Sequence, residues 1–168
     1  MRLGATGIRF VECTDLIPPF MKKKLTILLM FMTAVSFAQT TGTENIRRAA
    51  LDYIEGFYLG DTVMLKRSLA ANMYKYGYWL DKKTGKYGGE QMTFREAVDY
   101  ARDVMAKKRF PKADAPKNVV VLDQEEQVAV AKVTAWWGID YLLMAKHDGK
   151  WMIEQILWQG PIETVKKN

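Results

Sequence analysis

The chain has 168 residues, with 25 basic side chains, 19 acidic side chains, one cysteine and one histidine. Five of the basic and two of the acidic residues lie before residue 39. Residues 39–168 therefore have 20 basic and 17 acidic side chains, a net charge of about +3. These charges are scattered and form no basic stripe of the kind that nucleic acid requires. Cys13 also lies in this first part, so residues 39–168 have no disulfide and no thiol chemistry.

Residues 21–38 have the three parts of a secretory signal peptide. Met21 is followed by three lysines and then by an apolar run that ends at Val35, before the small residues of Ser36-Phe37-Ala38. The apolar run is shorter than the roughly 20 residues that cross a bilayer, so we expect no stable membrane anchor. We expect cleavage near Ala38 and a periplasmic or extracellular protein.

Residues 1–20 precede this signal, although a signal peptide normally begins at or near the initiator. We therefore interpret them as a mis-called upstream extension and Met21 as the true start. Residues 39–168 are then one α+β domain, because about 130 residues are enough for one hydrophobic core and too few for two domains.

The first half of this domain predicts helices. Thr41 and Glu44 form a capping box that opens a helix, and Gly60 is a typical residue to end it. The apolar positions of this helix recur at helical spacing: Ile46, Ala50, Tyr53, Ile54 and Phe57. Asp61 can cap a second helix that ends near residues 71–72. A second capping box, Thr93 with Glu96, opens a third helix with one apolar face.

Two segments between and after these helices predict strands. Over residues 74–79 three tyrosines alternate with Lys75, Gly77 and Trp79, which is a strand pattern followed by a turn and a return strand at Tyr87. From residue 118 onward the chain predicts antiparallel strands at residues 119–122, 127–139, 141–145 and 151–158, with an Asp-Gly hairpin at residues 148–149. Helices followed by such a meander indicate the α+β class.

This order of elements, which ends in the motif of residues 148–153, Asp-Gly-Lys-Trp-Met-Ile, resembles the nuclear transport factor 2-like superfamily. The segment of residues 139–143 is most similar to its bacterial branch labelled "putative lumazine-binding". The resemblance implies a cone-shaped fold, in which a strongly curved antiparallel sheet wraps around about three helices and encloses a pocket. It does not imply one activity, because fold does not fix function.

Asp140 is the candidate for acid–base chemistry, since it lies in a strand between apolar residues. It is either a structural group bonded to backbone where the strand bends, a ligand contact, or a base that acts with a tyrosine such as Tyr53, Tyr58 or Tyr76. His147 precedes the Asp-Gly turn and is expected to be exposed. Without a second histidine or a cysteine, we expect no metal site and no cofactor.

The aromatic content favours a pocket. Alternation assigns Trp136 and Trp137 to opposite faces of a strand, so one of them is expected to face the interior, and Trp151 is expected to pack in the core. The alternative is that these rings only fill the core or a dimer face. The residues expected to bind a ligand are these: Tyr53, Phe57, Tyr76, Trp136, Trp137, Asp140 and Trp158.

Three functions follow from these observations. The first is an exported, non-catalytic domain that binds a flat hydrophobic or heterocyclic small molecule and forms a homodimer through its outer sheet face. The second is a cofactor-independent isomerase or dehydratase that uses Asp140 and a tyrosine such as Tyr53. The third is a protein-interaction module with an exposed apolar patch on the sheet.

Overall fold

The structure, a computed structural model, describes residues 42–160. The predicted upstream extension, signal peptide and Thr41 capping box lie outside these residues. The described part begins with a helix over residues 42–59, here called the long helix, which ends at Gly60 as expected. The other elements follow in this order: α2 (Thr62–Ser68), β1 (Leu69–Leu80), β2 (Tyr87–Met92), α3 (Phe94–Lys107), β3 (Asn118–Gln124), β4 (Val128–Ala135), β5 (Gly138–His147) and β6 (Lys150–Gln159).

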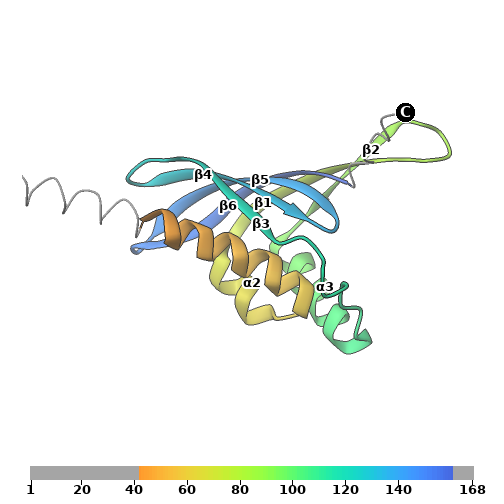
Figure 1. Cartoon of the computed structure of the whole chain (residues 1–168), viewed down its shortest axis with the longest axis horizontal. Coiled ribbons are helices and arrows are strands. Elements are labelled where there is room, and N and C mark those ends of the chain that lie inside the picture. Colours follow the sequence, from red (N-terminus) through yellow and green to blue (C-terminus); the bar gives the residue numbers. More distant parts are fainter. Residues whose placement is uncertain (1–41, 161–168) are drawn as a thin grey trace, which may run out of the picture. The chain divides into compact units, whose positions relative to one another are not determined.

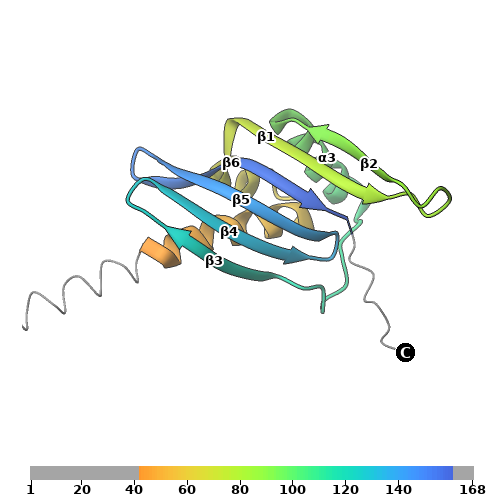
Figure 2. The ribbon, with the colours of Figure 1, turned by 90° about the horizontal axis from the view of Figure 1, so that it is seen from above.

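The six strands form one curved, open sheet in the order β2-β1-β6-β5-β4-β3, and the helices lie on one side of it (Figures 1 and 2). The α+β class and the curved sheet are therefore confirmed. Four of the five strand pairings are antiparallel, but β1 pairs with β6 in parallel, so the sheet is mixed. This pairing places the first and last strands side by side in the interior of the sheet.

Local signals explain most helix boundaries. The side chain of Asp61 accepts hydrogen bonds from the backbone at the start of α2, and Thr93 with Glu96 forms the predicted capping box of α3. The second helix ends at Ser68, earlier than expected, because Leu69 already pairs with Ile153 of β6.

The expected long strand over residues 127–139 is wrong. Ala135 pairs with Gly138, so Trp136 and Trp137 form the two-residue turn between β4 and β5. The signal for this turn is Gly138, whose φ of +137° is a conformation that side chains rarely adopt. Residues in a turn do not alternate between faces, and the assignment of the two tryptophans to opposite faces fails for this reason.

The core lies between the sheet and the long helix, where Ile46, Tyr53 and Ile54 are fully buried. Trp151 is 3 % exposed, so its predicted core position is confirmed. Gly77 of β1 is also required by packing, because a Cβ there would lie 1.6 Å from Nε1 of Trp158. The missing side chain leaves room for the Trp158 indole on the inner face of the sheet.

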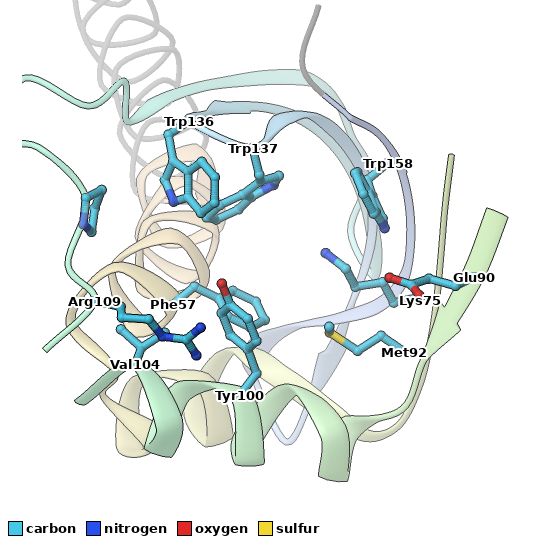
Figure 3. A pocket seen from close by; sticks show the side chains of 11 residues that line it. Phe57, Lys75, Glu90, Met92, Tyr100, Val104, Arg109, Trp136, Trp137 and Trp158 are labelled. Carbon is cyan, nitrogen blue, oxygen red and sulfur yellow. The ribbon is translucent and has the colours of Figure 1, made fainter. Parts of the chain in front are cut away.

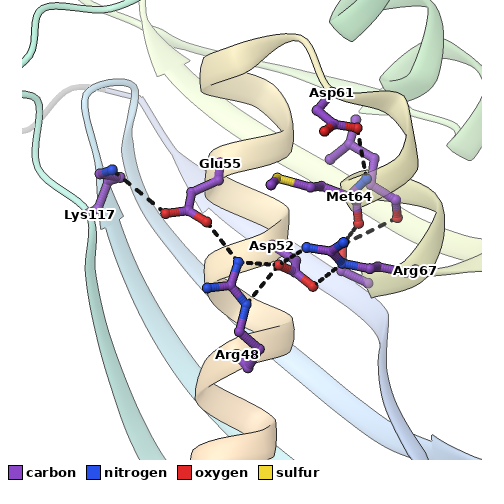
Figure 4. Close-up of polar contacts among 9 residues, drawn as sticks. Arg48, Asp52, Glu55, Asp61, Met64, Arg67 and Lys117 are labelled. Atoms are coloured by element: carbon purple, nitrogen blue, oxygen red, sulfur yellow. Dashed lines mark hydrogen bonds and ion pairs between the residues drawn. The ribbon is translucent and has the colours of Figure 1, made fainter.

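A cluster of ion pairs links the long helix to α2 (Figure 4). Asp52, in the long helix, is 5 % exposed and accepts hydrogen bonds from Arg48, 2.9 Å from its Nε, and from Arg67 of α2. Burial alone would raise the pKa of Asp52, but the hydrogen bonds and charges of Arg67 and Arg48 outweigh it and hold the pKa below its usual value. The ionised carboxylate therefore stabilises the fold.

Replacing Asp52 by Asn should lower the free energy of unfolding at pH 7 by about 1–3 kcal/mol, the usual effect of removing a buried charge-assisted hydrogen bond. Because folding depresses the pKa of Asp52, its contribution is present above the unfolded pKa of about 3.9 and is lost as the pH falls through the folded pKa. Urea unfolding of both proteins between neutral and acidic pH should show the difference shrinking at low pH. Asp99→Asn, at an exposed pair with Arg102, is the matched control and should have little effect at any pH.

Candidate ligand-binding cavity

A cavity of about 180 Å³ lies between the inner face of the sheet and the helices (Figure 3). Its walls come from the long helix, β1, β2, α3, the β4–β5 turn and β6. The lining residues are Phe57, Lys75, Glu90, Met92, Tyr100, Val104, Arg109, Pro111, Trp136, Trp137 and Trp158. Lys75, Phe57 and Val104 are buried and mark the floor, whereas Glu90, Arg109 and Trp136 are exposed and mark the mouth.

Aromatic rings in edge-to-face contact form one wall of the cavity. The ring of Trp137 lies 5.7 Å from that of Phe57 and 5.5 Å from that of Tyr58, between ring centroids. Tyr58 also fixes the turn, because its hydroxyl accepts a hydrogen bond from the backbone N–H of Trp136 at 2.9 Å and donates to the carbonyl of Pro116 at 2.6 Å. The hydrogen bonds of Tyr58 therefore hold this wall in place.

Lys75 is the polar group at the floor. Its side chain comes from the inner face of β1, and Figure 3 shows its amino group pointing into the cavity. Lys75 is 5 % exposed, and its Nζ lies 5.5 Å from the ring centroid of Phe57 and 5.7 Å from that of Trp158. These cation–π contacts offset part of the loss of hydration of the ammonium group.

Beneath the cavity, a chain of buried hydrogen bonds links Lys75 to Asp140. Nζ of Lys75 donates to the hydroxyl of Tyr53 at 2.5 Å, and this hydroxyl donates to Oδ2 of Asp140 at 2.8 Å. The indole N–H of Trp137 donates to the same carboxylate, 3.2 Å from Oδ1 and 3.0 Å from Oδ2. We call Lys75, Tyr53, Asp140 and Trp137 the buried polar chain.

Burial sets the protonation of this chain. It raises the pKa of Tyr53 well above its usual value, and the negative charge of Asp140 adds to that effect, so the phenol stays neutral. Burial lowers the pKa of Lys75, while the charge of Asp140 opposes that change. The amine is thus closer to losing its proton at neutral pH than an exposed lysine is.

The hydrogen bonds of Lys75 are incomplete. An ammonium group has three N–H donors, and within residues 42–160 the hydroxyl of Tyr53 is its one hydrogen-bond acceptor. Buried donors without a partner are costly. The remaining donors of Lys75 are therefore available to oxygen or nitrogen atoms of a molecule in the cavity.

The structure brings together several of the residues expected to bind a ligand. Phe57, Trp136, Trp137 and Trp158 line the cavity. Tyr53 and Asp140 lie beneath it, both with no exposed surface. Both oxygens of Asp140 accept hydrogen bonds from the protein, so this carboxylate holds Tyr53 and Trp137 in place instead of lining the cavity.

Tyr76 does not belong to this group, which corrects the expectation. It alternates with Lys75 along β1 and therefore lies on the outer face of the sheet, where it stacks on Tyr74. The sequence reasoning also missed Lys75. Lys75 and Gly77 alternate on the same face of the strand, and this pattern was a signal that both face inward. Lys75 was nevertheless not predicted to do so, because a lysine is seldom a buried residue.

The remaining candidate, His147, is peripheral. His147 is exposed at its turn and contacts Glu154, with 2.5 Å between Nε2 and Oε1. Arg109 at the mouth of the cavity forms an ion pair with Asp103.

Within residues 42–160, no group of three His, Cys, Asp or Glu side chains is placed to hold a metal ion. None of the helices in this range is long and apolar enough to cross a membrane.

Residues 41–159 match the model of the family described as "Putative lumazine-binding". The chain belongs to this family. No curated protein matches it in sequence.

Two solved structures show the same nuclear transport factor 2-like fold. One is an NTF2-like protein of unknown function from Shewanella baltica OS155, with 17 % identity, a TM-score of 0.54, and 71 % of this chain and 93 % of that chain covered. The other is an NTF2-like protein of unknown function from Methylobacillus flagellatus KT, with 18 % identity, a TM-score of 0.54, and coverage of 71 % and 92 %. At these identities the likeness concerns the fold alone.

Removing the hydroxyl of Tyr53 tests the buried polar chain. Tyr53→Phe leaves Lys75 without its acceptor and removes one donor to Asp140, so the free energy of unfolding should fall by about 1–3 kcal/mol. Tyr100→Phe is the control, because Tyr100 is 38 % exposed and lines the same cavity. Equal unfolding midpoints in urea for the two variants would contradict a structural role for the chain.

Proposed function

We propose that this protein is a binding domain for a flat, heterocyclic small molecule, held in the aromatic cavity with Lys75 as its polar anchor. The observation that carries the proposal is the buried ammonium group of Lys75, which points into the cavity and has, among residues 42–160, only the hydroxyl of Tyr53 as an acceptor. Most ligand sites are apolar pockets with a few well-placed polar groups, and this cavity has that composition.

The size of the cavity limits the ligand. A cavity of roughly 150 Å³ can hold one benzene molecule, so about 180 Å³ suits a compact ring system. Drug-sized ligands need roughly 300 Å³ or more. The rings of Trp137, Trp158 and Phe57 favour a flat molecule, and Lys75 favours one with a carbonyl or other acceptor on its edge.

The family description agrees with this ligand class. Lumazine is a flat bicyclic pteridine with two carbonyl oxygens on one ring, so it offers aromatic faces to the walls and acceptors to the amino group of Lys75. It is therefore the first probe to use. The same features would serve related pteridines and other fused heterocycles with a carbonyl edge.

Titration calorimetry with lumazine tests the proposal. The wild-type protein should bind one lumazine per chain, and Lys75→Met should weaken binding by about 10- to 100-fold, the usual effect of losing a hydrogen bond to a charged group. Lys132→Met is the matched control, because Lys132 also lies on a strand near a tyrosine ring, with its Nζ 5.9 Å from the centroid of Tyr141. Absence of binding to the wild-type protein, or equal affinity of the Lys75 and Lys132 variants, would reject the proposal.

We also propose a homodimer through the outer face of the sheet. Large apolar side chains gather there: Tyr74 and Tyr78 of β1, Tyr141 and Leu143 of β5, and Leu157 of β6 are 44–53 % exposed. Leu157 lies beside Tyr141 in the register of β5 with β6, so the side chains are neighbours. A continuous apolar face of this kind marks an interaction surface. The export inferred from residues 21–38 remains part of this proposal.

Light scattering after size exclusion should give the mass of a dimer for the wild-type protein and of a monomer for Leu157→Glu, because a buried unpaired carboxylate opposes association. Val63→Glu is the control, since Val63 is a 65 % exposed apolar residue of α2 and not of the sheet. A monomeric wild-type protein would refute the dimer without affecting the cavity.

A further inference from the structure

We propose that Lys75 is a reactive amine that forms an imine with the carbonyl carbon of a small aromatic aldehyde or ketone held in the cavity. This inference rests on the proposed function, because it needs the cavity to admit a ring. The inference goes beyond the proposed function, because it assigns covalent chemistry to Lys75, whose role there is only to bind.

Lys75 has the surroundings of an imine-forming lysine. It is the one buried lysine within residues 42–160, and its amino group ends in the cavity and not in solvent (Figure 3). Lysines become nucleophilic when an apolar pocket removes their hydration and favours the neutral amine. The lowered pKa of Lys75, caused by burial, agrees with this geometry.

The cavity would also hold the carbonyl compound next to Lys75. A flat ring placed between Trp137, Trp158 and Phe57 would have the amino group of Lys75 within reach of a carbonyl substituent on its edge. Holding the two reacting groups together makes the addition effectively unimolecular. The amino group of Lys75 lies over four aromatic rings, whereas within residues 42–160 those of Lys132 and Lys146 each lie over one.

The buried polar chain provides a path for the proton that must leave Lys75 before attack. As Lys75 passes a proton to the hydroxyl of Tyr53, this hydroxyl can pass its own proton to Oδ2 of Asp140, over distances of 2.5 and 2.8 Å. When the carbinolamine loses water, the proton returns along the same path to the departing oxygen. Tyr53 and Asp140 therefore act as positioning and proton-carrying groups for Lys75.

The reaction is balanced without any other reactant. The nitrogen of Lys75 forms a bond to the carbonyl carbon, and the carbon–oxygen bond breaks. Two of the three ammonium protons leave with the oxygen as water, and the third stays on the protonated imine. No oxidant, reductant or metal ion takes part.

Reductive trapping tests this proposal. The full chain is incubated at neutral pH with benzaldehyde and sodium cyanoborohydride, and the product is analysed by intact mass and peptide mapping. We expect one benzyl group per chain, located on Lys75. The adduct should be lost in Lys75→Met, kept in Lys132→Met, and formed more slowly in Tyr53→Phe, which lacks the proton path.

Several outcomes are decisive. If Lys75 of the folded wild-type protein is unmodified, or is modified no more than Lys132, the proposal is wrong, and this comparison needs no variant to fold. Lumazine should protect Lys75 from benzylation, since both occupy one cavity. Binding of lumazine with an unreactive Lys75 would overturn the imine alone and leave the proposed function intact.

Discussion

The structure depends on one buried interaction, the hydrogen-bond chain from Lys75 through Tyr53 to Asp140. Its members come from β1, the long helix and β5, so the chain joins the helix to two strands of the sheet. Burying an ammonium and a carboxylate is costly unless both are bonded. Here the hydroxyl of Tyr53 bridges the two charged groups, and the indole N–H of Trp137 donates a further hydrogen bond to the carboxylate.

This chain also shapes the cavity. Asp140 holds the indole of Trp137, which forms one wall, and Tyr53 holds Lys75, which forms the floor. Both oxygens of the carboxylate accept hydrogen bonds from Tyr53 and Trp137, whereas the ammonium of Lys75 has one acceptor within residues 42–160. We therefore propose that the amine acts in the cavity, and that Asp140 acts through Tyr53 and Lys75 and not on a ligand directly.

Local sequence signals predicted much of the fold. The caps at Asp61 and Thr93 depend on neighbouring residues only, and they gave helix starts that the structure confirms. The turn at Trp136 and Trp137 was missed because tryptophans are rare in turns and Gly138 was the only cue. Tyr53 was one of the tyrosines named from the sequence as a partner of Asp140, 87 positions away. The link from Tyr53 to Lys75 could not be predicted, because only long-range packing shows that Lys75 faces inward.

The most direct test of a cavity anchored by Lys75 is NMR of the lysine side chains, with the Cε and Nζ resonances observed as lumazine is added. If Lys75 anchors the ligand, its resonances should shift with saturation, while those of Lys132, on the outer face, should stay unchanged. Saturable binding that leaves the resonances of Lys75 unshifted would place the ligand elsewhere and exclude Lys75 as the anchor.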